Sequence, residues 1–220
     1  TSNNHQGQLC GHIDWQSNRQ IDMLLKATKF NLKMLNPLMP QDFRINAAIN
    51  GELKMNKTPQ QQYVRGEMTI DIPQFRLNRP LLVTNPPPFK LSGVQLKALL
   101  NNQGLALNAT TTGSNQVNAS IQLPAYHLID STLTTQKLQG QIIAHLTDLQ
   151  SLPIFIPALQ NSSGQIQGKL TVSGTANHPQ LLGEMKLTHG STTLPSISMA
   201  LKTINLTTNW QRDHKISLKG

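Results

Sequence analysis

The sequence has little of what many protein functions require. Its 220 residues include one cysteine, Cys10, so no internal disulfide can form. Aromatic residues make up only 4% of the chain, too few for a surface on which nucleic-acid bases would stack. The longest apolar stretch, Leu152 to Leu159, is eight residues long and contains two prolines. A membrane-crossing helix needs ~20 residues, so we expect no such span.

Signals for catalysis and metal binding are missing as well. The seven histidines show no ligand spacing. Paired carboxylates, a serine elbow and a phosphate-binding loop are also lacking. We therefore predict that the protein is not an enzyme, with no catalytic residue, no metal site and no cofactor.

Charge is sparse and uneven in sign. Charged residues make up 13% of the chain, against an average of about 25%. Nineteen Lys and Arg against 10 Asp and Glu give a formal charge of +9, which suits acidic partners such as anionic lipid headgroups. A solvated face without a partner is an equal alternative. Nucleic acid is disfavoured, because basic residues form no run longer than two.

What the sequence does contain is an internal repeat. Residues 27–77 match residues 144–194 without a gap at an offset of 117 positions, with 12 identities. Average composition would give roughly three identities by chance. We predict one continuous segment over residues 1–220, in which the two copies lie end to end.

Both copies alternate apolar and polar residues, the pattern of a strand with one dry and one wet face. The run from Phe43 to Met55 would span roughly 43 Å as one strand. Glycines such as Gly168 and Gly183 lie on the apolar side, which indicates a close approach or a bend. The pattern shifts at Pro73, after which Phe75 and Leu77 are predicted on the opposite face, and again between Leu201 and Ile204. Such shifts predict bulges.

Two segments at equivalent places in the repeat break the alternation. They are Leu32 to Pro40 and Leu149 to Pro157, and each predicts a short helix or capped loop that proline ends. Such a segment could plug the end of a hydrophobic sheet or act as a gate, and the sequence favours neither.

The second copy contains a series of motifs in a fixed order. D-L is followed by L-P-x-x-x-P within 148–157, and G-x-I-x-G-x-L-x-V-x-G-T covers 164–175. P-x-L-x-G-x-x-x-L follows over 179–187, departing from the pattern at Gln180 and Leu182 around Leu181. With these motifs the second copy resembles the TamB family of diderm bacteria. Their order and spacing are more specific than any single motif, and with the first copy the resemblance covers nearly the whole chain.

The resemblance implies an all-β fold, in which a long curved sheet forms a U-shaped trough (a β-taco) with a hydrophobic interior and few short helical segments. It implies a periplasmic location in a protein anchored in the inner membrane, as part of a longer chain. It also implies that the protein acts together with the outer-membrane barrel TamA. The implied function is a hydrophobic conduit for glycerophospholipids between the two membranes. A scaffold that assists barrel assembly by strand pairing is the alternative.

The apolar side of the strands supplies the candidate lining for phospholipid acyl chains. The residues are Phe43, Ile45, Ile49, Leu53, Met55, Met68, Ile70, Ile72, Leu105, Leu107, Ile121, Ile142, Ile166, Leu170, Val172, Met185 and Leu187. Alternation alone is equally compatible with a closed β-sandwich that acts as a spacer, because both folds bury one face.

Overall fold

The protein is a single antiparallel sheet with a few short helical connections. The computed structural model describes residues 7–16, 20–40, 42–80, 86–128, 132–210 and, by backbone alone, 216–219. The strands are β1 (Gln8–Trp15), β2 (Ile21–Asn31), β3 (Arg44–Lys57), β4 (Arg65–Asn78), β5 (Phe89–Asn101), β6 (Gly104–Thr112), β7 (Asn115–Pro124), β8 (Gln139–Leu146), β9 (Gln160–Gly174), β10 (Pro179–Leu194), β11 (Met199–Trp210) and β12 (Ile216–Lys219). The 3-10 helices are η1 (Leu32–Leu38), η2 (Leu133–Thr135), η3 (Leu152–Ile154) and η4 (Pro195–Ile197).

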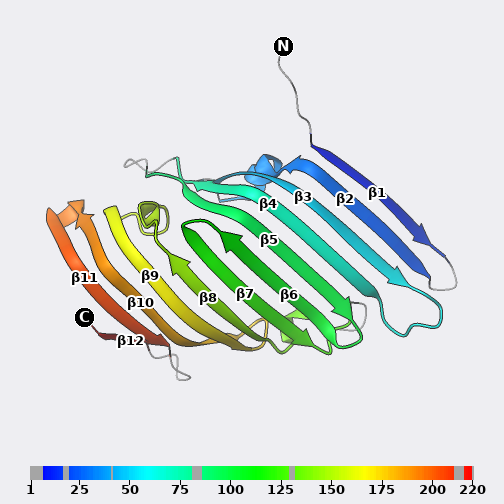
Figure 1. Cartoon of the computed structure of the whole chain (residues 1–220). Helices are drawn as coiled ribbons and strands as arrows, with labels where there is room; N and C mark the ends of the chain where they lie inside the picture. Colours follow the sequence, from blue (N-terminus) through cyan, green and yellow to red (C-terminus); the bar gives the residue numbers. More distant parts are fainter. Residues whose placement is uncertain are drawn as a thin grey trace, which may run out of the picture.

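Each strand pairs with the strand that precedes it and the strand that follows it in the chain. The order from β1 to β12 is therefore sequential, and the sheet does not close on itself (Figure 1). No second sheet packs on it within the described residues, so the closed sandwich is ruled out. The predicted all-β fold class is confirmed.

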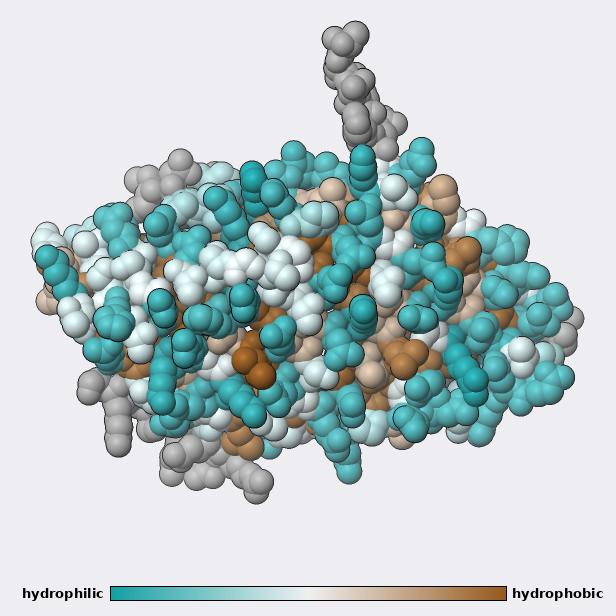
Figure 2. Space-filling view, viewed as in Figure 1, coloured by the Kyte–Doolittle hydropathy of each residue, from teal (hydrophilic) through white to brown (hydrophobic). Residues whose placement is uncertain are grey.

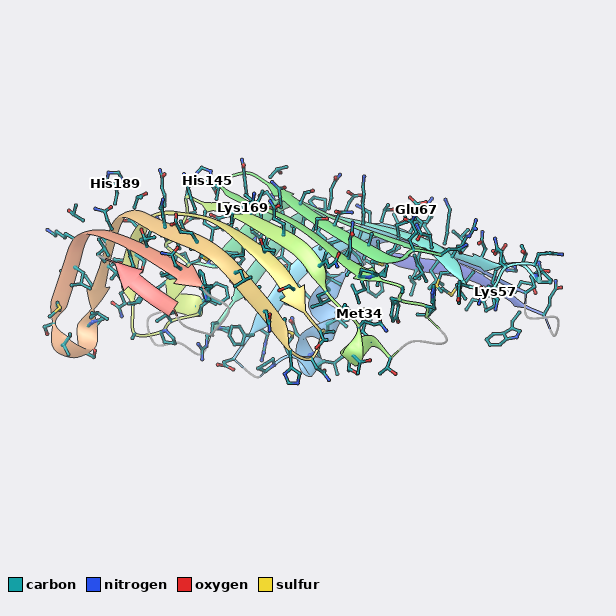
Figure 3. The ribbon with its side chains drawn as sticks, turned by 90° about the horizontal axis from the view of Figure 1, so that it is seen from below. Met34, Lys57, Glu67, His145, Lys169 and His189 are labelled. Carbon is teal, nitrogen blue, oxygen red and sulfur yellow. The ribbon has the colours of Figure 1, made fainter. Side chains whose placement is uncertain are left out.

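The sheet is arched, and its two faces differ. Figure 3 shows Glu67, His145, Lys169 and His189 on the convex side and Met34 on the concave side. We call these the outer face and the inner face. Figure 2 shows that one face of the molecule is mainly hydrophilic, with scattered apolar residues. A sheet with one polar face does not need a second layer to cover that face.

Bulges in several strands bend the sheet. Lys29 (φ 50°) and His189 (φ 50°) have left-handed backbone conformations. Their N–H groups donate to side-chain oxygens of the next strand, Asn50 Oδ1 at 2.8 Å and Asn205 Oδ1 at 3.1 Å. Both positions coincide with shifts in strand register, and at Thr203 (φ 57°) the bulge predicted between Leu201 and Ile204 is found. Such irregularities increase local bending and twist.

The bulge near Pro73 corrects one prediction. Strand β4 pairs with Asn50 and with Ala47 of β3. Between these two pairs β4 has three residues and β3 has two. The extra residue reverses the alternation, so Phe75 packs beside Ile72 on the inner face instead of turning outward. The prediction that Phe75 and Leu77 occupy the opposite face was therefore wrong, because a bulge cancels the change in sequence parity.

The connections between strands form two rims. The connections after β2, β4, β6, β8 and β10 lie along one edge, which we call the η1/η3 rim, and those after the odd-numbered strands lie along the other, the η2 rim (Figure 1). The two segments predicted as short helices or capped loops contain η1 and η3. Asn31 caps η1 by accepting a hydrogen bond from the Lys33 N–H at 2.9 Å.

Two buried clusters lie on the inner face, one toward each rim. Val64, Leu100, Leu123 and Tyr126 form the cluster toward the η2 rim. Beside it, the Tyr63 and His127 rings stack with centroids 3.5 Å apart, joining the β3–β4 and β7–β8 connections. The cluster toward the η1/η3 rim consists of Ala47, Ile72 and Val94. These contacts hold in place connections that are distant in the sequence.

Inner-face glycines lie opposite large side chains. Gly168 pairs with Met185, and Gly66 pairs with Met55. In both pairs the methionine side chain covers the space that a Cβ atom of the glycine would fill. The close approach predicted at these glycines is therefore made by a large side chain of the paired strand. Small residues opposite large ones let side chains converge on a concave surface.

Gly183 and Gly66 occupy the same position in the two copies but differ in backbone conformation. Gly183 has φ +142°, and a Cβ there would collide with the Lys169 carbonyl oxygen and lie 3.1 Å from Leu170 Cα. A Cβ at Gly66 would lie 3.1 Å from Met55 Cγ, an atom that can move. We expect Gly183→Ala to lower the free energy of unfolding by about 1 to 3 kcal/mol, more than Gly66→Ala does. Urea unfolding of both variants measures this, and equal losses would contradict it.

An arginine at the η1/η3 rim connects the two copies. Arg79 donates to Asp42 Oδ2 from Nε at 2.9 Å and from Nη2 at 2.7 Å, and from Nη1 to the Ile154 carbonyl at 3.2 Å. Its guanidinium also lies over the Phe43 ring, 5.0 Å from the centroid. Ile154 belongs to η3 and is fully buried. Arg79 therefore holds η3 against the ends of β3 and β4.

This contact makes stability dependent on pH in the acidic range. The hydrogen bonds from Arg79 hold the pKa of Asp42 below its ordinary value of 3.8. A depressed folded-state pKa contributes stability above about pH 4, and the contribution is lost as the pH falls through the folded-state pKa. We expect Asp42→Asn to lower Tm at neutral pH, with a difference from wild type that shrinks toward zero in acid. Thermal unfolding across the pH range measures it.

The control is Glu184→Gln, which removes an exposed ion pair with Lys186 on the outer face. Its Tm should change little, because exposed ion pairs contribute weakly. If the Asp42→Asn deficit persisted undiminished in acid, the ionised carboxylate would not be its cause.

Candidate functional site

Apolar residues on the inner face line up across the strands. One row of directly paired residues passes from β1 to β11 without a polar side chain. Its members are Leu9, Ala27, Gly51, Ile70, Leu96, Ala109, Ala119, Ile142, Leu170, Gly183 and Trp210. The inner face thus carries a continuous apolar path that runs perpendicular to the strands.

A second row flanks the first on the side of the η2 rim. It consists of Gly11, Leu25, Leu53, Met68, Ala98, Leu107, Ile121, Gly140, Val172 and Leu181. A shorter third row consists of Ile13, Met23, Met55, Gly66, Leu100, Leu105 and Leu123. Together the rows make a band several residues wide.

The outer face has the opposite composition at the same level of the sheet. The row between the first two inner rows consists of Cys10, Lys26, Glu52, Thr69, Lys97, Asn108, Ser120, Gln141 and Thr171, and it ends on β10 at the apolar Leu182. Cys10 is exposed. The difference in polarity between the faces follows from alternation, because each strand sends successive side chains to opposite sides.

Most of the predicted lining residues lie in the inner rows. Leu53, Met68, Leu107, Ile121, Val172, Ile70, Ile142, Leu170, Met55 and Leu105 belong to the three rows above. Ile166, Leu187 and Met185 lie beside them, since Ile166 pairs with Leu187 and Met185 pairs with Gly168. Ile45, Ile49 and Ile72 belong to the cluster near the η1/η3 rim. The structure therefore brings these residues onto one surface, although they come from seven strands.

Three predicted residues have surroundings that differ from the rest. Phe43 precedes β3 and lies beneath the Arg79 guanidinium at the rim, outside the rows. Ile72 and Val172 are 8% and 5% exposed, so neighbouring side chains already cover them. The remaining predicted residues are half-buried, with part of each side chain accessible on the inner face.

Sequence reasoning missed the residues that border the apolar band. Tyr126, Leu149 and Ile154 are buried in the connections. The stacked rings of Tyr63 and His127 and the pair of Arg79 with Asp42 join segments far apart in sequence. No local pattern predicts such contacts, because each depends on how connections fold over the sheet.

The face is most open at β1. Leu9, Ile13 and Trp15 are 62%, 62% and 75% exposed, and every residue of β1 is exposed. A small depression of about 100 Å³ lies beside them, bordered mainly by Leu25, Ala27 and other row residues. At this end the apolar surface is accessible to solvent.

Clusters of metal-ligating side chains and membrane-spanning helices are both absent from the described part of the chain. In the described ranges no three His, Cys, Asp or Glu side chains are arranged to hold a metal ion, and His5 and His214 lie outside those ranges. None of the helices in the same ranges has the length and apolar character needed to cross a membrane. What the inner face offers is contact with apolar groups.

The chain matches one model of a known protein family. The family model described as TamB, N-terminal domain, matches residues 3–187, which is most of the chain. Comparisons with curated proteins and with solved structures found no match. The matched range contains the first copy of the repeat and most of the second. Because this match covers most of the chain, the chain belongs to the TamB family of cell-envelope transport and assembly proteins.

Proposed function

We propose that the inner face carries the acyl chains of glycerophospholipids across the periplasm, between the inner and outer membranes. The observation that carries this proposal is the row from Leu9 to Trp210, which crosses the sheet without a polar side chain. Acyl chains require a continuous apolar surface and no specific partner. The sheet supplies one because its own backbone groups are paired between strands.

The dimensions of the band suit this cargo. Strands lie ~4.8 Å apart, so a row that crosses eleven strands is roughly 50 Å long. An acyl chain spans roughly half of the ~30 Å hydrocarbon core of a bilayer. A lipid could thus shift along the row while it keeps apolar contact at every position.

A charge placed in the row should stop transport. Leu170 lies in the first row, between Ile142 and Gly183. We expect Leu170→Asp to reduce co-purified phospholipid about tenfold or more, because a carboxylate in an apolar path must be desolvated when acyl chains cover it. Quantitative mass spectrometry of the lipid bound to the purified protein measures the effect.

Gln167→Asp is the matched control, because Gln167 lies on the exposed outer side of the same strand. It introduces the same charge and should leave bound lipid unchanged. Protease resistance of both variants verifies folding, and Leu170→Ser provides a milder change if the aspartate variant does not fold. Normal lipid content in a folded Leu170→Asp protein would refute the conduit.

A specific observation also favours the alternative, a scaffold that pairs with strands of outer-membrane barrels as they assemble with TamA. In the described part of the chain, β1 pairs on one side only, with β2, and its residues are all exposed. An exposed edge strand is a template for pairing with another strand. In this role TamA and nascent barrels are the partners, and the inner face takes no part in binding them.

The single cysteine allows the two functions to be separated. Cys10 lies on β1 and is exposed, so a maleimide photocrosslinker attaches at the edge alone. For a conduit we expect no crosslink from Cys10 to barrel proteins, and lipid adducts from a photoreactive residue at position 170. Barrel adducts from Cys10 without lipid adducts from position 170 would favour the scaffold.

A further inference from the structure

The short helix η1 carries three leucines along one side. Leu32, Leu35 and Leu38 are spaced three residues apart in this 3-10 helix. Side chains at positions i and i+3 of a 3-10 helix eclipse one another, so the three leucines lie in line. We call this set the η1 stripe. It presents one apolar side of the helix from its first residue to its last.

The base of the η1 stripe is part of the inner face. Leu32 packs against the buried cluster near this rim, as do Ile70 and Leu96 of the first apolar row. Figure 3 shows Met34, which also belongs to η1, on the concave side of the sheet. The helix therefore projects on the side of the inner face, and its stripe continues the apolar surface of that face into the connection.

Exposure rises along the η1 stripe from its base to its tip. Leu32 is half-buried, whereas Leu35 is 40% exposed and Leu38 is 83% exposed. Asn36, on another side of the helix, fixes η1 to β3. Its side chain accepts a hydrogen bond from the Ile45 N–H at 2.7 Å and donates one to the Ile45 carbonyl at 3.2 Å. These bonds hold η1 in place without burying Leu35 and Leu38, so both side chains are accessible to another molecule.

The second copy of the repeat contains the same stripe. The three positions recur as Leu149, Leu152 and Phe155. The Leu152 N–H donates to the Leu149 carbonyl and the Phe155 N–H donates to the Leu152 carbonyl, each at 3.0 Å. This i to i+3 bonding gives the eclipsed arrangement of the first copy. Again the base is the most buried part, since Leu149 is 5% exposed and Phe155 is 51% exposed.

The tip of the second stripe shows which contact this position makes. The Phe155 ring meets the Phe89 ring edge to face, with centroids 5.3 Å apart. Phe89 lies on β5 and shares the parity of Leu91, which packs in the cluster on the inner face. An apolar group of the inner face thus contacts the tip in the second copy. At the exposed Leu38 of the first copy, an apolar molecule lying on the inner face can make the equivalent contact.

We propose that Leu35 and Leu38 contact the acyl chains of a phospholipid that lies on the inner face of the first copy, so that η1 is a side wall of the trough. This inference rests on the proposed conduit and adds a second apolar contact to it. The stripe carries no polar side chain, so it suits acyl chains and not a headgroup. A protein partner is a poorer fit, because stable protein interfaces bury about 1,200 Å² or more, beyond what two leucines supply.

The test measures binding of dioctanoylphosphatidylglycerol to the purified protein. We expect Leu35→Gln/Leu38→Gln to bind this lipid about tenfold more weakly than wild type, because both side chains lose apolar contact with the acyl chains. Protease resistance verifies folding. Leu38→Gln alone, at the most exposed position of the stripe, provides a second variant if the double variant does not fold, and should weaken binding in the same direction.

The control is Leu24→Gln/Leu99→Gln, which removes two leucines that are 39% and 48% exposed. Leu99 pairs with Glu67, which Figure 3 shows on the convex side, and Leu24 pairs with Lys54, the partner of Glu67 on β3. The control variant thus loses the same groups from the outer face and should bind lipid as wild type does. Equal losses in the two double variants would attribute the effect to general surface hydrophobicity and overturn the assignment.

A photoreactive residue at position 38 detects the contact directly. We expect lipid adducts from positions 38 and 170 and none from position 24. Adducts from position 170 but not from position 38, with unchanged lipid binding by the double variant of the stripe, would overturn the side wall and leave the conduit standing. No lipid adduct from either position would refute the conduit and the side wall together.

Discussion

The register between neighbouring strands is the constraint on which this structure depends. A slip of one residue between any two strands would move every apolar side chain of the displaced strand to the polar face. The row through Gly51, Ile70 and Leu96 exists because successive pairs keep the same alignment. The bulges preserve the rows, since an extra residue in β4 returns Phe75 to the inner face where the sequence parity had changed.

The two copies of the repeat have the same order of elements but different surroundings. η1 has no buried residue, and Leu38 is 83% exposed. In the second copy Pro153 and Ile154 are buried, and Arg79 holds η3 against the first copy. Where the first copy packs apolar side chains near the rim, the second places Ser162 and Thr192. The repeat thus supplies a continuous apolar band, and divergence replaces apolar side chains with hydroxyl groups near one rim of the second copy.

The fold was largely predictable because it is built from local alternation. Strand β3 matches the predicted run to within two residues at each end, and the short helices lie where prolines interrupt the pattern. Alternation alone did not predict the open form of the sheet, because alternation is the same in a sandwich, whereas the resemblance to the TamB family implied it. Phe43 was assigned to the lining by parity, yet the chain turns before β3 and Phe43 packs under Arg79.

By itself, the sequence determined which side chains share a face, where the chain repeats and that the protein resembles the TamB family, because these depend on spacing along one chain. The tertiary structure decided that the sheet stays open, that the apolar residues of separate strands join into rows, and that like charges meet at the rims. Arg76 and Lys90 are fourteen residues apart, and only the pairing of β4 with β5 places them opposite each other. Cross-strand neighbours are set by register, which local spacing does not encode.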